Sequence, residues 1–328
     1  MVSSLYPKRS WFVAALLIAA AAASAADQRP NIVFILIDDQ RYDAFSFEGH
    51  PFLQTPHLDQ LAADGVVFEN AFVTTSLCSP SRASILTGQY AHRHQVLANR
   101  TALDPSLATF ATTLHNAGYD TAFVGKWHMG APDDSPRPGF EHWVSFPGQG
   151  SYRNQRLNID GTHEETDGYL TDILTDHAVS FVRQERKRPF LLYLSHKAVH
   201  APFIPAQRHR GSYEKRRYQH PETMADTPAN YGGKPDWVRA QRNSWHGVDG
   251  MYDNSVDFDQ FALDYAETLR AVDDSVGRVI QALSDSDQLD DTLIVFTSDN
   301  GFQFGEHGLI DKRTMYEASI RVPLIVHG

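Results

Sequence analysis

Continuous apolar runs alternate with amphipathic segments along this chain, and that alternation limits the folds open to it. The runs at 31–37 (NIVFILI), 190–194 (FLLYL) and 293–296 (LIVF) are almost entirely apolar. Such runs are typical of strands that are buried on both faces of a parallel sheet. Residues 261–283 instead repeat apolar side chains at helical spacing, which predicts a long helix packed on the core. We therefore expect an α/β sandwich with a mostly parallel central sheet.

Glycine, proline and the same periodicities predict the other elements. We expect further strands at 121–124 and 322–326, and helices from Pro56 to near Gly65 and at 80–86, 107–117 and 169–183. Gly88 and Gly118 stand where two of these helices should end, because glycine adopts left-handed backbone angles easily.

Residues 210–260 differ from the rest of the chain. They are rich in polar, aromatic, glycine and proline residues and lack a clear period. Such a segment is either a disordered excursion or a lid over an active site, and we favour the lid. Five aromatic side chains in it suit contacts with a sugar: Tyr213, Tyr218, Trp237, Trp245 and Tyr252.

Polar side chains cluster where the predicted strands end. The four groups are Asp38-Asp39, Lys126 with His128, His196 with His200, and Asp299-Asn300. In open α/β sheets, ligands gather at the carboxyl ends of the strands. The sequence therefore predicts an active site at this edge of the sheet.

The amino-terminal residues predict export. A basic pair, Lys8 and Arg9, precedes an apolar run at 11–23, and Ala-Ser-Ala at 23–25 offers a cleavage site. This pattern predicts a secretory signal peptide over residues 1–25. The alternative is a membrane anchor, but the run is short for a bilayer span and rich in alanine. We expect a periplasmic or secreted protein with no membrane span after signal removal.

Charge and cysteine content narrow the function further. The net charge of -11 argues against a nucleic-acid partner, because general nucleic-acid binders carry a basic excess. Cys78 is the one cysteine of the chain, so no disulfide can form within it. A single thiol in an oxidising compartment is inert and buried, reactive, or chemically altered.

Two acidic pairs suggest a metal site. Asp38-Asp39 directly follows one predicted buried strand, and Asp299-Asn300 lies at the end of a second. Adjacent carboxylates repel unless a cation lies between them, and calcium and magnesium prefer oxygen ligands of these types. Zinc is less favoured, since neither cysteine nor histidine is next to these residues in sequence. The alternative reading is two pairs of solvated loop residues.

Cys78 starts the most informative segment, 77–88 (LCSPSRASILTG). Pro80 suits the first turn of a helix, which places Cys78 at the helix start. Free N–H groups there favour an anion, and Arg82, one turn further on, can reach back to the same place. A tetrahedral oxyanion could be held there. The generic alternative is an unmodified cysteine thiolate activated by the helix.

This segment resembles the signature of the type I sulfatases, Cys-x-Pro-x-Arg followed by Ala-Ser-Ile-Leu-Thr-Gly. The resemblance extends from about Asn31 to the end of the chain. Its other motifs are 31–39 (NIVFILIDD), 125–130 (GKWHMG), 199–203 (VHAPF), 298–308 (SDNGFQFGEHG) and 311–317 (DKRTMYE). Several motifs in the same order are far more specific than any one of them.

The resemblance implies a fold, a modified residue and a metal. The fold would be an alkaline-phosphatase-like sandwich, with residues 26–328 as the catalytic domain. In that family the cysteine is converted to formylglycine, which implies a formylglycine-generating enzyme as a partner during maturation. Calcium, with magnesium less favoured, would be bound by Asp38, Asp39, Asp299, Asn300 and the formylglycine at Cys78.

The resemblance also implies roles for the basic residues. The hydrated aldehyde at Cys78 would supply the nucleophile, with Arg82 holding it. Lys126 and His128 would contact the sulfate and the nucleophile, and His200 and Lys312 would face the sulfate and the leaving group. A metal and several cations suit this reaction, because attack on sulfur builds up charge on oxygen. His196 and His307 are further candidates for substrate contacts, with a loop or turn role as their alternative.

Family members generally continue beyond a point equivalent to Gly328, so we expect that a smaller C-terminal subdomain is missing from this sequence. The substrate implied is a sulfated carbohydrate, because 305–317 resembles the N-acetylglucosamine-6-sulfatase branch, and a small sulfate ester could also serve. Two alternatives remain. One is a phosphonate or phosphodiester hydrolase of the same superfamily, and the other is a non-catalytic glycan-binding protein with unmodified Cys78.

Overall fold

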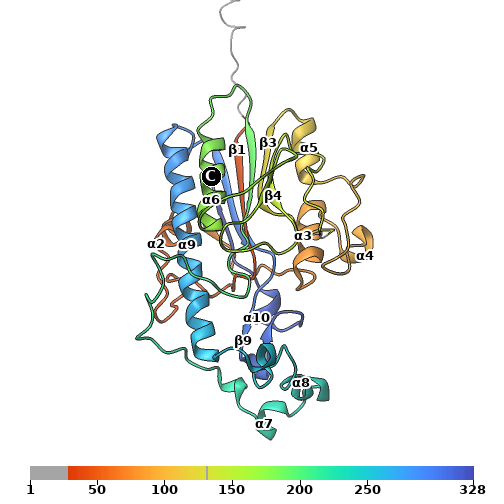
Figure 1. Cartoon of the computed structure of the whole chain (residues 1–328), viewed down its shortest axis with the longest axis vertical. Coiled ribbons are helices and arrows are strands. Elements are labelled where there is room, and N and C mark those ends of the chain that lie inside the picture. Colours follow the sequence, from red (N-terminus) through yellow and green to blue (C-terminus); the bar gives the residue numbers. More distant parts are fainter. Residues whose placement is uncertain (1–28, 131) are drawn as a thin grey trace, which may run out of the picture.

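A nine-stranded sheet forms the centre of the computed structural model, which describes residues 29–130 and 132–328 (Figure 1). The strand order is β2-β11-β8-β1-β7-β3-β4-β5-β6. The bounds are β1 Asn31–Ile37, β2 Val66–Val67, β3 Asp120–Lys126, β4 His142–Phe146, β5 Leu157–Ile159, β6 Thr162–Glu164, β7 Phe190–Ser195, β8 Thr292–Ser298 and β11 Leu324–His327. The predicted signal peptide, residues 1–25, lies outside the described residues.

The five strands in the middle of the sheet run parallel. They are β8, β1, β7, β3 and β4 in that order. The outer strands β11 and β2 on one side, and β5 and β6 on the other, pair antiparallel. All six residues of β7 are buried, as its apolar run predicted. The prediction of a mostly parallel α/β sandwich is therefore confirmed.

Helices cover both faces of this sheet (Figure 1). One layer contains α2 Pro56–Asp64, α6 Leu170–Val182 and α9 Phe258–Asp285; the other contains α3 Cys78–Thr87, α4 Ala91–His94 and α5 Phe110–Asn116. Along β1, Val33, Ile35 and Ile37 join the core beneath the first layer. Leu36 packs with the second layer, as the alternation of side chains along a strand requires. No helix among the described residues is both long and apolar enough to cross a membrane.

The helix that carries the cysteine begins earlier than the predicted Pro80. Leu77 has extended backbone angles and Cys78 is the first helical residue of α3. Pro80 lies in the first turn, where its missing N–H costs no hydrogen bond. The helix ends at Gly88, which takes the left-handed conformation with φ 65°, as predicted. Cys78 is therefore fixed in the helix rather than in the loop before it.

Residues 210–260 fold into short helices that pack at one end of the sheet. They are η1 Glu222–Met224, α7 Pro228–Tyr231, α8 Asp236–Gln241 and η2 Met251–Asn254. Both η1 and α8 contact η3 Glu306–Gly308, and Gly247 forms an isolated bridge with Leu309. Figure 1 shows α7 and α8 beyond the sheet, near β9 Gln303–Phe304 and α10 Glu317–Ile320. The segment thus packs on residues that follow β8, and its role as a lid stays a prediction.

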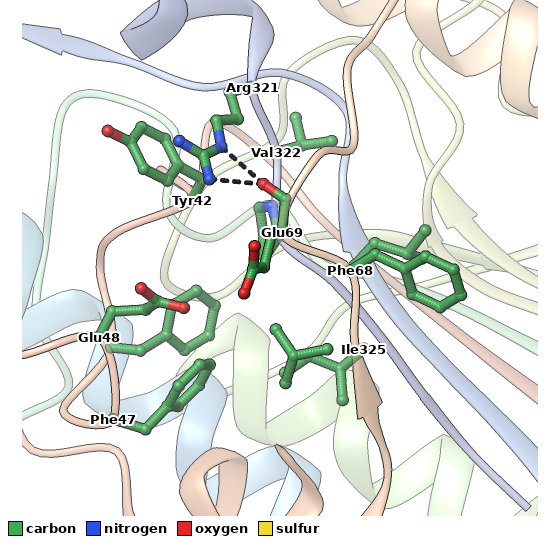
Figure 2. Close-up of a pocket in the computed structure, with 12 residues that line it drawn as sticks. Tyr42, Phe47, Glu48, Phe68, Glu69, Arg321, Val322 and Ile325 are labelled. Atoms are coloured by element: carbon green, nitrogen blue, oxygen red, sulfur yellow. Dashed lines mark hydrogen bonds between the residues drawn. The ribbon is translucent and has the colours of Figure 1, made fainter.

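The β2–β11 edge of the sheet leaves apolar side chains at the surface. Phe47 and Phe68 are exposed and line a hollow beside β11 (Figure 2). Arg321, just before β11, donates from Nε to the backbone oxygen of Glu69 at 3.0 Å. Its guanidinium carbon also lies 4.2 Å from the centre of the Tyr42 ring. These contacts hold the loop after β2 against the start of β11.

At Gly125, near the end of β3, the backbone lies too close to the neighbouring strand β7 for any side chain. A methyl group there would lie 1.8 Å from the backbone oxygen of Ser195 in β7, and its φ of +126° is unfavourable for other residues. We expect Gly125→Ala to lower the free energy of unfolding by about 3 kcal/mol or more, measured by urea denaturation. Gly161→Ala is the control. Gly161 also has a positive φ, but an added methyl group there would meet no atom within 4 Å. It should cost about 1 kcal/mol, and equal losses would contradict the steric argument.

Candidate active site

The two acidic pairs meet at the carboxyl ends of β1 and β8. These strands are parallel neighbours whose register aligns Ile37 with Ser298, so the residues that follow each strand lie side by side. Oxygen atoms of Asp38, Asp39 and Asp299 all lie within 4.8 Å of one another. The three carboxylates and Asn300 are fully buried. The reading of solvated loop residues is therefore wrong.

This acidic cluster fits a hard cation. The Asn300 amide donates to Asp39 Oδ1 at 2.6 Å, while the buried amide oxygen of Asn300 has no hydrogen-bond partner among the described residues. Burial, together with the neighbouring carboxylates, raises the pKa of Asp39 to about 7 and that of Asp299 to about 6. A free amide oxygen beside carboxylates that resist joint ionisation is the ligand set that calcium or magnesium takes.

Side chain 78 lies next to the acidic cluster. The Cys78 sulfur is 3.5 Å from Asp38 Oδ1, to which it can donate, and the residue is fully buried. Burial and then the Asp38 charge raise the pKa of this thiol well above its usual range. Both effects weigh against the alternative of an activated thiolate, although the start of α3 favours one.

Three buried cations surround the same cluster, and each lies closest to a different one of its three carboxylates. Arg82 pairs with Asp299 at 2.8 Å. Lys126 contacts Asp38, and Lys312 contacts Asp39. The resemblance implied Lys312 rather than the adjacent Arg313, and the structure buries Lys312 and leaves Arg313 exposed.

Arg82 is the most firmly held of these cations. One terminal nitrogen, Nη1, donates to the backbone oxygen of Lys126 at 2.6 Å and to Ser195 Oγ at 2.7 Å. The other, Nη2, is 3.8 Å from Asp38 Oδ2 and has no hydrogen-bond partner among the residues described. One face of the guanidinium is thus oriented by protein, and one donor is left for a ligand.

His128 and His200 both lie at the site and are neutral. Burial, followed by the charge of Lys126, lowers the pKa of His128 to about 2, and its Nδ1 has no partner in the described part of the chain. Burial and then Lys312 hold the pKa of His200 well below its usual range. Nε2 of His200 is 3.9 Å from Asp39 Oδ2, and its Nδ1 is 2.6 Å from the backbone oxygen of Ala201.

The structure does not bring His196 and His307 into this cluster. His196 turns toward the helix layer, where its Nε2 lies 3.0 Å from Ser275 Oγ on α9. The ring of His307 packs on Tyr316, with 3.8 Å between the ring centres. Neither has an ion pair with the acidic cluster among the residues that the structure places.

Two residues that sequence reasoning missed lie at the site. Gln149 accepts a hydrogen bond from Lys126 Nζ at 2.5 Å. Lys197 is buried, and its Nζ lies 4.4 Å from the centre of the Tyr152 ring. Lys197 stands between two histidines that were singled out, and Gln149 lies between two glycines, but neither pattern indicates which side chain turns inward.

A cavity of about 220 Å³ adjoins the site at Lys312. Segment 210–260 supplies part of its wall, including Trp237 and His246, and 309–314 supplies the rest. The Trp237 side chain is 51% exposed, whereas Tyr213 is only 5% exposed and lies in the core. Of these two aromatic residues expected to contact a sugar, Trp237 is accessible and Tyr213 is not.

Comparison with known proteins identifies the family of this chain. A family model described as Sulfatase matches residues 30–328. The chain belongs to the sulfatase family. The chain is 33% identical to the N-acetylglucosamine-6-O-sulfatase of Bacteroides thetaiotaomicron, and the alignment covers 91% of the chain and 63% of that protein. The chain thus spans less than two thirds of this relative.

Solved structures resemble the fold closely. One determined with its substrate D-glucosamine-2-N,6-O-disulfate has a TM-score of 0.81 at 32% identity, covering 91% of the chain and 71% of that structure. A phosphonate monoester hydrolase from Silicibacter pomeroyi has a TM-score of 0.72 at 25% identity, covering 92% and 68%. The alkaline-phosphatase-like sandwich is therefore confirmed, and the chain covers about 70% of the length of each of these two structures.

The placement of His196 predicts a dependence of stability on pH. Burial lowers its pKa from 6.5 to about 4, so its neutral form stabilises the fold above pH 6.5 and that contribution is lost as pH falls toward 4. We expect the parent to lose about 2 kcal/mol between pH 7 and pH 5 that His196→Asn does not lose, measured by urea denaturation. His92→Asn, on the surface, should behave as the parent. Identical pH profiles for parent and His196→Asn would contradict this placement.

Proposed function

We propose that this chain hydrolyses a sulfate ester of a carbohydrate, with side chain 78, converted to formylglycine, as the nucleophile. The observation that carries the proposal is the position of this side chain. It lies 3.5 Å from an acidic cluster that fits a divalent cation, and buried Arg82, Lys126 and Lys312 surround that cluster. Such a set of charges stabilises a tetrahedral anion and the charge that develops during attack on it.

Calcium would be held by Asp38, Asp39, Asp299 and Asn300, and would supply a Lewis acid for the sulfate oxygens. The hydrated aldehyde at position 78 would supply the attacking hydroxyl. The side chains of the protein bind and orient the sulfate. Arg82 is fixed by Asp299 and Ser195 and presents Nη2 to an anion. Lys126, positioned by Gln149, adds a second donor beside side chain 78.

The histidines provide proton transfer at defined atoms. Nδ1 of His200 must donate to the Ala201 carbonyl, because a carbonyl oxygen can only accept. Exchange of a proton with reacting groups is therefore confined to its Nε2. His128 is neutral and has Nδ1 free for a hydrogen bond to the sulfate or the nucleophile. A neutral imidazole can form a hydrogen bond at each of these atoms, and general acid–base catalysis requires that a bound anion raise its pKa toward the working pH.

A carbohydrate substrate is supported by the relatives and by the cavity beside Lys312. The solved structure with D-glucosamine-2-N,6-O-disulfate is 32% identical to this chain. The exposed Trp237 ring in the cavity wall suits packing against a sugar ring. The export predicted from residues 1–25 would place the enzyme in the periplasm or outside the cell, with a formylglycine-generating enzyme acting during maturation.

The central test is the chemical state and necessity of side chain 78. In the exported protein, the peptide that contains Cys78 should have the mass of formylglycine rather than of cysteine. Cys78→Ala should retain the fold and lose turnover of glucosamine-6-sulfate by about 1,000-fold or more, since the nucleophile is gone. Circular dichroism provides the control for folding. A native thiol in the exported protein would support the non-catalytic glycan-binding alternative.

Sulfate and phosphonate esters of one leaving group separate the remaining alternative. The same aryl leaving group should be released faster from its sulfate than from its methylphosphonate under identical conditions. The likeness to a phosphonate monoester hydrolase makes this comparison necessary. Faster release from the phosphonate would favour a phosphonate hydrolase that uses the same residues.

Calcium binding is tested without turnover. Calcium should raise the Tm of the parent in a saturable manner, because a ligand that binds only the folded state stabilises it. Asn300→Ala removes the unpartnered amide oxygen and should raise the calcium concentration needed by about tenfold or more. Asn230→Ala, in the short helix α7, is the matched control. A parent Tm that is indifferent to calcium would contradict the metal assignment.

A further inference from the structure

Lys197 is a buried cation without a carboxylate of its own. It is 3% exposed and lies in the turn that follows β7. Its Nζ is 4.4 Å from the centre of the Tyr152 ring. Within residues 29–130 and 132–328, no carboxylate forms an ion pair with this ammonium group.

The other buried cations of the site differ from Lys197 in this respect. Arg82 has Asp299, Lys126 has Asp38, and Lys312 has Asp39, so each of the three carboxylates already has a partner. Removing an ammonium group from water without a counter-ion is costly, and a contact with an aromatic ring offsets only part of that cost. The free protein therefore carries a largely desolvated ammonium group at Lys197 without a counter-ion, which lowers its stability.

Backbone contacts fix the Lys197 turn against the acidic cluster. The Asp38 amide donates to the Ala198 oxygen at 3.0 Å, and the Val199 amide donates to the Asp38 oxygen at 2.7 Å. The His200 amide closes the turn by donating to the Lys197 oxygen at 3.0 Å. The residues that follow the lysine are thus tied to the site.

The charges of the site act on this ammonium group. Burial, followed by the charge of Lys126, lowers the pKa of Lys197 to about 8, while Asp38 and Asp39 oppose the shift. The group is therefore still cationic at neutral pH and is within electrostatic range of the cluster beside side chain 78.

We propose that Lys197 is an additional substrate-binding residue, whose ammonium group pairs with the negative charge of the sulfate ester. This inference rests on the proposed function, because it requires the substrate anion to enter the same site. The incoming anion provides the counter-ion that the protein does not, so part of the substrate's binding energy comes from relieving an unpaired buried charge.

The variant Lys197→Met tests this with two readouts that move in opposite directions. Methionine is unbranched and one atom shorter than lysine, so it keeps most of the apolar side chain and removes the charge. We expect the Tm of the calcium-loaded protein to rise by about 3 °C, because an unpaired buried charge is gone. We expect the Kd of inorganic sulfate, measured by calorimetry at constant ionic strength, to increase by about tenfold or more. KM for the sulfate ester should increase with it.

Two matched variants separate these effects from a general loss of a lysine. Lys126→Met removes the cation closest to Asp38 and should lower the Tm. Lys234→Met removes a cation whose Nζ lies 5.6 Å from the Tyr231 ring, outside the acidic cluster, and should leave sulfate affinity unchanged. If Lys197→Met is poorly soluble, Lys197→Arg should retain sulfate affinity within about threefold.

The outcomes are distinct. A lowered Tm together with unchanged sulfate affinity in Lys197→Met would show a purely structural lysine and overturn the inference. A parent that does not bind sulfate in a saturable manner would overturn it as well. By contrast, sulfate binding that depends on Lys197 in a protein that hydrolyses no sulfate ester would leave the inference standing and contradict the proposed function.

Discussion

Three carboxylates buried at the ends of two adjacent strands dominate this structure. Asp38, Asp39 and Asp299 cannot all be ionised so close together without positive charge around them. Three buried cations, Arg82, Lys126 and Lys312, provide this positive charge. They belong to a helix, a strand end and a loop, respectively. The same cations, with a metal among the carboxylates, suit the binding of a tetrahedral anion. The groups that balance the buried negative charge are therefore also the groups that the proposed chemistry uses.

The parallel sheet makes this arrangement possible. Because β8, β1, β7 and β3 run in the same direction, the residues that follow each of them emerge at one edge. Gly125 lets β3 approach β7 closely enough for the Lys126 oxygen to share Arg82 with Ser195. The site is therefore built on strand ends and on the first turn of α3, whose positions the core determines.

Much of this could be predicted from residue order. Apolar runs that lead to Asp38 and to Asp299 predicted both the strands and the meeting of the acidic pairs. The spacing of one helical turn between Cys78 and Arg82 predicted that these two side chains lie together. Elements as short as β5 and β6, with three residues each, have too few residues for a period to be visible. Nor does sequence reveal orientation within a turn: His196 faces Ser275 while Lys197 next to it faces Tyr152. Contacts with residues that are distant in sequence determine these orientations.

The complete burial of Cys78 has a consequence for the order of events in biosynthesis. A side chain with no accessible surface, held in the first turn of a packed helix, cannot enter the active site of another protein. Any enzyme that alters it must therefore act on the nascent or unfolded polypeptide, before α3 docks on the sheet. A chain that folded before it was modified would keep the Cys78 thiol, and it would be correctly folded but without the nucleophile.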